Sequence, residues 1–166
     1  TKFVGAFVSL MKANMYTIEE VREMARFKYD VRGLYIIDKI ISPIYREYVE
    51  TLSKNGEIDF IDLILKATEI CEANPQYRQY DYIIVDEFQD ISKDRYRLLK
   101  SLRNDKPMTK MFCVGDDWQS IFRFTGSDMG LFTQFKDYFG CTAECRIETT
   151  YRFKQPLISS SSKFIM

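Results

Sequence analysis

Two short apolar runs, each followed at once by polar residues, constrain the fold of this chain more than any other feature. Residues 82–85 (YIIV) and 111–114 (MFCV) flank a stretch with helical apolar spacing, residues 92–103. A continuous apolar run of this length predicts a buried strand of a parallel sheet. Strand, helix and strand in this order form a right-handed crossover unit, so the pattern predicts an α/β fold.

The same pattern continues on both sides of this unit. Downstream, residues 127–138 have helical spacing, Gly140 is a typical helix stop, and residues 146–149 (RIET) are expected to form a third strand. Upstream, a helix is expected over residues 59–73, with Asp59 as its cap. The sequence therefore predicts three parallel strands with two intervening helices.

Residues 1–56 have helical spacing throughout, with no strand alternation to compete with it. Thr17 followed three residues later by Glu20 predicts a capping box at a helix start. Gly56 marks a helix end, and Pro43 is expected to kink or divide the long helical segment before it. A helical part is thus expected to precede the sheet.

Composition and charge exclude several classes of function. The chain has no histidine, which excludes Ser-His-Asp, Cys-His and His-ligated metal chemistry. Its charges balance at 24 basic and 24 acidic residues, but residues 57–90 are acidic and residues 91–166 basic. That unevenness fits a cation site followed by an anion-binding surface, but from the counts alone ordinary solvated helix faces are the favoured explanation.

Location and completeness can also be predicted. The apolar stretches are far shorter than the roughly 20 residues that span a bilayer, so we expect a soluble, cytoplasmic protein with no membrane partner. The four scattered cysteines indicate reduced thiols. Because the chain begins with Thr1 rather than Met, we expect it to be an excised fragment.

Polar residues follow each predicted strand at the point where it ends. These segments are DEFQD at residues 86–90, GDDWQSIFRF at 115–124 and TYRF at 150–153. The carboxyl ends of parallel strands lie side by side at one edge of a sheet, where such folds bind ligands. The sequence therefore predicts a site built from acids, an amide and an arginine.

The residue types in these segments suit metal-assisted phosphoryl transfer. Asp86 is able to hold a hard cation, and Glu87 is able to accept a proton from an attacking water. Arg152 suits a bidentate phosphate contact, and Gln119 suits a hydrogen bond to the transferring group or the water. Taken alone, the first segment also reads as an acidic loop that caps the next helix.

The order and spacing of the three segments resemble motifs II, III and IV of the UvrD/Rep family of superfamily 1 DNA helicases. The segment GDDWQSI, followed by an aromatic residue, Arg and Phe, is most similar to the helicase IV branch. Residues 58–63 (IDFIDL) also resemble an element that precedes motif II in the family. The resemblance covers residues 58–153 and treats residues 1–57 as a helical region.

The resemblance implies a fold, a set of cofactors and site roles. The fold would be the C-terminal half of a RecA-like P-loop NTPase motor domain, preceded by a helical insertion subdomain. Asp86 would coordinate Mg²⁺, and Glu87 would be the general base that activates water for ATP hydrolysis. Gln119 and Arg152 would contact the γ-phosphate of ATP.

The resemblance also implies a partner, single-stranded DNA. Phe122 and Phe124 match the aromatic positions on which bases stack, and Arg123 lies between them. From the residues alone, core packing for the two phenylalanines and surface pairing for Arg123 are the ordinary alternatives.

When the resemblance is extended to the whole sequence, it divides the chain into three parts. These are a helical subdomain (1–56), a partial motor domain (57–155) and the start of a following helix (156–166). None of the glycines in residues 1–166 is followed by Lys, so the phosphate-cradling sequence G-x-x-x-x-G-K-[ST] is missing from the 166-residue segment. We therefore expect the segment to be inactive by itself, and to need the remaining parts of its own motor domains.

Two other classes of function stay open at this point. A degenerate motor domain that serves as a DNA-binding or protein-interaction module would also lack the phosphate-cradling loop. A metal-dependent nuclease would use clustered acids to bind a pair of Mg²⁺ ions, but it leaves Gln119 and Arg152 without a role.

Overall fold

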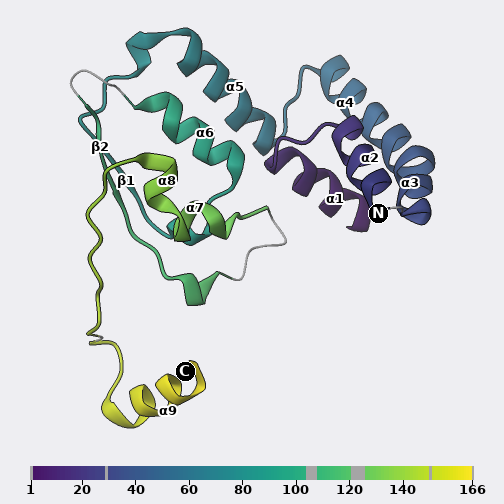
Figure 1. Ribbon diagram of the computed structural model, residues 1–166. Coiled ribbons are helices and arrows are strands. Elements are labelled where there is room, and N and C mark those ends of the chain that lie inside the picture. Colours follow the sequence, from purple (N-terminus) through teal and green to yellow (C-terminus); the bar gives the residue numbers. More distant parts are fainter. Residues whose placement is uncertain (1, 29, 104–107, 121–125, 150, 166) are drawn as a thin grey trace. The chain divides into compact units, whose positions relative to one another are not determined.

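The structure is a computed structural model of the chain, and it forms two compact units that are described separately (Figure 1). The described residues are 2–28, 30–103, 108–120, 126–149 and 151–165. The units comprise Thr1–Phe135 and Lys136–Met166.

The first unit begins with a helical part, as the sequence predicts. Its elements are α1 (Lys2–Ala13), α2 (Ile18–Phe27), α3 (Val31–Ile36), a π-helical turn (Ile37–Ile41) and α4 (Ser42–Asn55). The Thr17–Glu20 capping box is present, since Glu20 N–H donates to Thr17 Oγ1 at 3.2 Å and Thr17 N–H donates to Glu20 Oε2 at 2.8 Å. Gly56 ends α4 in the left-handed conformation, with φ at 66°.

Pro43 divides the long helical segment by changing the type of helix. Proline has no N–H to donate to the carbonyl group four residues before it, so the regular ladder is interrupted there. A π-helical turn lies immediately upstream of Pro43, and at its end Ser42 N–H donates to Ile37 O. Ile41, at the end of that turn, is fully buried.

The sheet is formed by two parallel strands, β1 (Tyr82–Val85) and β2 (Lys110–Cys113), which flank the crossover helix α6 (Lys93–Leu102). Their register places Tyr82 opposite Lys110 and Val85 opposite Cys113. The first two strands and the helix between them are therefore confirmed, although β2 begins and ends one residue earlier than predicted and α6 is one residue shorter at each end.

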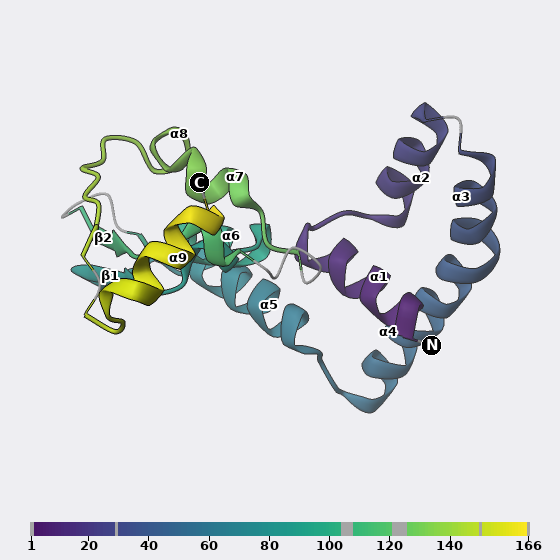
Figure 2. The ribbon, with the colours of Figure 1, turned by 90° about the horizontal axis from the view of Figure 1, so that it is seen from below.

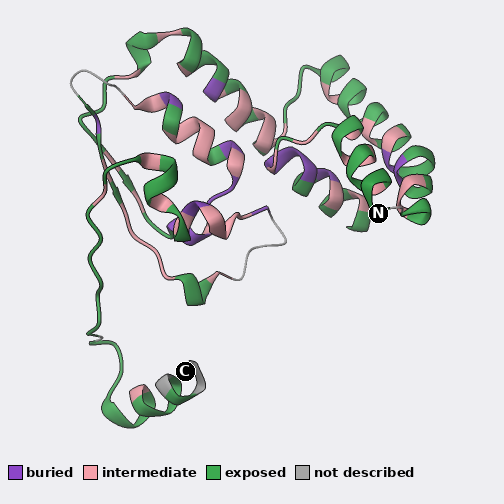
Figure 3. Cartoon of the chain, in the orientation of Figure 1, coloured by how far each residue is buried: buried purple, intermediate pink, exposed green. Residues whose placement is uncertain are grey.

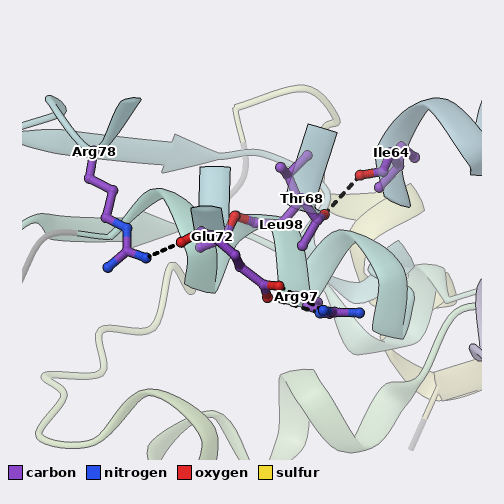
Figure 4. Close-up of polar contacts among 7 residues, drawn as sticks. Ile64, Thr68, Glu72, Arg78, Arg97 and Leu98 are labelled. Atoms are coloured by element: carbon purple, nitrogen blue, oxygen red, sulfur yellow. Dashed lines mark hydrogen bonds and ion pairs between the residues drawn. The ribbon is translucent and has the colours of Figure 1, made fainter. Parts of the chain in front are cut away.

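Helix α5 (Phe60–Ala73) lies beside α6 in both views (Figures 1 and 2) and is followed by a 3₁₀ turn (Pro75–Tyr77). A bidentate ion pair fastens the two helices together: Arg97 donates to the Glu72 carboxylate at 2.9 and 2.7 Å (Figure 4). This contact with Arg97 holds the pKa of Glu72 below its usual value. Thr68 on α5 is fully buried and donates to Ile64 O at 2.8 Å.

One face of the sheet is largely exposed in the part of the first unit that the structure describes. Tyr82, Ile84 and Phe112 alternate along the two strands and are 63%, 74% and 63% exposed, while Ile83 and Met111 on the other face are half-buried (Figure 3). Apart from Lys110 at the start of β2, both strands have apolar or aromatic side chains on both faces, which is the composition of a sheet covered on both sides.

The predicted third strand is not formed. Residues 146–149 have no regular secondary structure, and Ile147 is 83% exposed. The physical reason lies in the composition of the segment: only one of its four residues is apolar, so the segment gains little from burial between helices. Among the described residues, the sheet has two strands, which corrects the expected three-stranded unit.

The helix predicted over residues 127–138 is divided into two short helices. Asp128 caps α7 (Met129–Thr133) by accepting from Gly130 N–H at 3.0 Å, and α8 (Phe135–Phe139) follows after Gln134. Gly140 stops α8 with φ at 86°, as expected. The second unit ends in α9 (Gln155–Ile165), consistent with the helix expected to begin near residue 156.

A nearly buried lysine connects α1 to the start of α5. Lys12 Nζ lies 2.6 Å from a carboxylate oxygen of Asp59 and 2.6 Å from one of Asp62, and its side chain is 7% exposed. Tyr48 on α4 donates to Asp59 at 2.8 Å. Asp59 also caps α5 by accepting from Asp62 N–H at 2.8 Å. The segment resembling the element before motif II therefore fastens the helical part to α5.

This cluster contributes to stability over a defined pH window. Burial lowers the pKa of Lys12, but the hydrogen bonds and charges of Asp59 and Asp62 outweigh it and hold that pKa above its usual value. Burial raises the pKa of Asp59, but the bonds from Lys12, the Asp62 N–H and Tyr48 hold it below its usual value. The contribution is lost as pH falls through the folded pKa of Asp59, or rises through that of Lys12.

Replacing the lysine tests the connection. Lys12→Met leaves two partly buried carboxylates unpaired, so we expect the free energy of unfolding at pH 7 to fall by about 2–4 kcal/mol in urea denaturation. The matched control is Lys54→Met, because Lys54 is 78% exposed and lies 3.8 Å from Glu50. It should change stability by less than about 0.5 kcal/mol. Equal effects of the two substitutions would contradict the assigned role of Lys12.

Candidate functional site

Two acidic residues, Asp86 and Glu87, follow β1 directly, and the local backbone conformation fixes the position from which each side chain starts. Asp86 Oδ1 accepts a hydrogen bond from Glu87 N–H at 2.9 Å. Glu87 has φ at 50° and ψ at 43°, in the left-handed region that residues other than glycine rarely adopt. Both side chains are exposed. Backbone strain of this kind concentrates at functional sites, where the surrounding structure maintains it.

A buried amide connects this turn to the loop after β2. Gln89 is 1% exposed, its Nε2 donates to Glu87 Oε2 at 2.7 Å, and its Oε1 accepts from Asp116 N–H at 3.0 Å. The donor and the acceptor of the same amide group are therefore both used. The two segments that follow the strands are joined through one side chain.

Gly115 allows the two segments to approach each other this closely. A Cβ atom at this position would lie 2.7 Å from Gln89 Oε1 and 2.8 Å from a ring carbon of Phe132. Both distances are shorter than real Cβ contacts, so any other residue would displace one of these neighbours. The glycine after β2 is thus explained by the packing of Gln89.

The loop after β2 holds Gln119 in turn. Asp116 Oδ2 accepts from Gln119 Nε2 at 2.7 Å, and Asp116 Oδ1 accepts from Trp118 N–H at 3.1 Å. These bonds shape a 3₁₀ turn, Asp117–Gln119, in which the Trp118 side chain is 66% exposed. Hydrogen bonds therefore run without interruption from Glu87 through Gln89 and Asp116 to Gln119.

An aromatic core supports the turn after β1. Phe88 lies in a 3₁₀ turn (Phe88–Asp90), is 1% exposed, and donates its N–H to Val114 O at 2.9 Å. Its ring centre lies 5.3 Å from that of Phe135, edge to face, and 6.4 Å from that of Phe132. This packing anchors the turn that carries the acidic residues.

Asp86, the residue predicted to hold a metal, follows β1 directly and is exposed. Within the described ranges, no three His, Cys, Asp or Glu side chains gather closely enough to hold a metal ion. Mg²⁺ is commonly bound by one or two carboxylates together with substrate phosphates and water, which fits a single carboxylate at a sheet edge.

The structure brings three of the predicted site residues together, namely Asp86, Glu87 and Gln119. Arg152 is an exposed residue of the second unit. The predicted DNA contacts Phe122, Arg123 and Phe124 lie outside the described residues.

Gln89 and Asp116 are site residues that the sequence reasoning did not assign. Both lie in the segments that follow the strands, and the adjacent Gly115 was the available signal of a close approach.

Comparison with known proteins identifies the family. The UvrD/REP helicase N-terminal domain matches residues 6–140. The chain belongs to the UvrD/REP helicase family. This match includes both segments of the linked site, so the resemblance drawn from motifs II and III is confirmed.

Individual relatives agree with this assignment. DNA helicase IV of Escherichia coli (strain K12) is 36% identical over 160 residues, which is 96% of this chain and 23% of the relative. ATP-dependent DNA helicase PcrA of Bacillus subtilis (strain 168) is 29% identical over 88% of the chain and 20% of its own length. DNA helicase II of Rickettsia typhi is 33% identical over 78% of the chain and 20% of its own length. The chain thus spans about a fifth of the length of these relatives.

Among the residues that the structure describes, none forms a helix long and apolar enough to cross a bilayer.

Two glycine substitutions test the packing of the linked segments. Gly115→Ala places a methyl group against Gln89 and Phe132, so we expect it to lower the free energy of unfolding by about 1–3 kcal/mol. Gly5→Ala is the matched control, because Gly5 lies inside α1 and a methyl group there would meet no other atom within 4 Å. It should raise stability by about 0.5–1 kcal/mol through helix propensity. Thermal denaturation measures both effects, and the same sign for the two would contradict the close approach.

Proposed function

We propose that this chain is part of an ATP-dependent DNA helicase or translocase that couples Mg-ATP hydrolysis to movement along single-stranded DNA. Residues 57–155 would form part of its first motor domain, residues 1–56 a helical insertion, and residues 156–166 the start of the next helix. The observation that carries this proposal is the hydrogen-bonded link between Glu87 and Gln119 at the carboxyl edge of a parallel sheet. Family membership and the acidic pair after β1 support it.

The proposed chemistry is the attack of water on the γ-phosphate of ATP. Mg²⁺, when bound, would neutralise phosphate charge, and Asp86 is the residue that would hold it. Glu87 would accept the proton of the attacking water. Gln119 and Arg152 would donate hydrogen bonds to the γ-phosphate, where negative charge accumulates.

The proposed partner is single-stranded DNA, with Phe122 and Phe124 stacking on bases and Arg123 beside them. Stacking suits a motor because every base has an aromatic face, so the grip does not depend on sequence. Such an enzyme acts on DNA in the cytoplasm of a bacterial cell, which is the proposed location.

The exposed face of the sheet supports the view that further parts of the motor domain pack against this chain. Tyr82, Ile84 and Phe112 are apolar or aromatic and mostly exposed. The phosphate-cradling sequence G-x-x-x-x-G-K-[ST] does not occur in residues 1–166. The 166-residue chain by itself is therefore expected not to hydrolyse ATP.

Substitution of the proposed general base, Glu87, tests the proposal by its effect on turnover. In the full-length protein, Glu87→Gln keeps the size of the side chain but removes proton acceptance, so we expect ATP turnover stimulated by single-stranded DNA to fall by about 10²–10⁴-fold. Nucleotide binding should be nearly unchanged. Glu47→Gln, at an exposed position of α4, is the matched control and should retain turnover.

Each result separates the proposal from its alternative. A full-length protein that binds DNA but never hydrolyses ATP would indicate a degenerate, non-catalytic module. Normal turnover in Glu87→Gln would remove Glu87 as the base.

A further inference from the structure

We propose that Gln89 is a positioning residue that sets the orientation of the Glu87 carboxylate and couples it to Gln119. This inference rests on the proposed function, because it assigns Gln89 a role in the same hydrolysis. Gln89 would not touch ATP or the attacking water. It would act through the two side chains that do.

The contact with Glu87 fixes one of the two carboxylate oxygens. Gln89 Nε2 donates to Glu87 Oε2 at 2.7 Å, a short bond in which the acceptor is charged. Within the described residues, no group donates to Glu87 Oε1. That oxygen is left to accept a proton, in a direction set by the bond to Oε2.

The amide has only one orientation that satisfies both of its neighbours. Rotating it by 180° would place its oxygen against the Glu87 carboxylate and its NH₂ group against the N–H of Asp116. Both contacts would then be repulsive. Since Gln89 is 1% exposed, water is not available to replace either bond. The orientation of Glu87 is therefore tied to the position of the Asp116 backbone.

The same backbone position determines where Gln119 lies. The Asp116 carboxylate accepts from the Gln119 side chain at 2.7 Å and from the Trp118 N–H at 3.1 Å. A shift of Gln119 toward or away from a bound phosphate would move Asp116, and with it the acceptor bond of Gln89. The arrangement thus transmits the position of one candidate catalytic side chain to the other.

Two substitutions in the full-length protein test this role. Gln89→Met keeps the approximate length of the side chain and removes both hydrogen bonds. We expect kcat for DNA-stimulated ATP hydrolysis to fall by about 10–100-fold while the KM for ATP stays within about twofold, because a misplaced group mainly impairs the chemical step. Gln79→Glu is the control, because it replaces an exposed glutamine outside this site. It should leave kcat unchanged.

Gln89→Glu gives a readout that a merely structural role would not move. A protonated carboxyl group can donate through its O–H and accept through its carbonyl oxygen, which replaces the one donor and the one acceptor bond that the amide makes here. An ionised carboxylate has no donor and repels Glu87. The α7 helix, which packs on this turn, has no charged residue within Met129–Thr133. Within residues 86–90 and 115–120, the described parts of the two segments that meet here, the charged groups are all acidic, which raises the pKa of the introduced carboxyl group: Asp86, Glu87, Asp90, Asp116 and Asp117. Arg95 of α6, which donates to Asp90 O at 3.5 Å, is the cation that faces this turn and acts in the opposite direction.

The pH dependence follows from this environment. The ratio of kcat in Gln89→Glu to kcat in the wild type should rise as pH falls from about 8.5 to about 6, because protonation restores the donor to Glu87. The corresponding ratio for Gln89→Met should stay flat over the same range.

The outcomes distinguish this inference from the proposed function. If the wild type hydrolyses ATP and Glu87→Gln does not, while both Gln89 variants have normal kcat, only the role of Gln89 is overturned. Flat ratios for both variants, or a loss of binding in place of kcat, would make Gln89 a packing residue and overturn it too. If the wild type itself has no DNA-stimulated hydrolysis, the proposed function fails first.

Discussion

The parallel pairing of β1 with β2 is the interaction on which the rest of the site depends. Backbone hydrogen bonds continue beyond the paired strands, since Val114 N–H donates to Val85 O and Phe88 N–H donates to Val114 O, both at 2.9 Å. The backbone hydrogen bonds thereby bring two polar segments together that lie nearly thirty residues apart in the sequence. An apolar strand pair supplies the alignment, and the chemistry is carried by the residues that follow each strand.

Burial of the Gln89 amide turns this alignment into a specific geometry. A buried amide left without partners is costly, so the conformation in which both of its bonds are made is strongly favoured over nearby ones. That preference explains two otherwise unfavourable local features, the left-handed backbone of Glu87 and the tight contact at Gly115. Both features cost free energy, and the packing around Phe88 and the two loops offsets that cost.

Much of this arrangement was predictable from residue patterns, and the exceptions have physical causes. The two strands and the capping box at Thr17 follow from local apolar runs and spacing, and both are confirmed. The assignment of Asp86, Glu87 and Gln119 to the site follows from the motif resemblance and stays a proposal. The prediction of a third strand at residues 146–149 (RIET) was wrong. An extended segment becomes a strand only where a neighbouring strand pairs with it, and this segment has little apolar surface to bury. The role of Gln89 depends on a contact across 27 positions, to Asp116, which local periodicity does not encode. The link from Lys12 to Asp59 is non-local in the same way.

A crystal structure of the full-length protein with Mg²⁺ and a non-hydrolysable ATP analogue tests the proposed site most directly. We predict the metal at Asp86, a water within hydrogen-bond distance of both Glu87 and the γ-phosphate, Gln119 at that phosphate, and Gln89 still bonded to Glu87 and Asp116. Nucleotide bound away from the carboxyl ends of β1 and β2, or Glu87 directed away from the γ-phosphate, would contradict the proposed function.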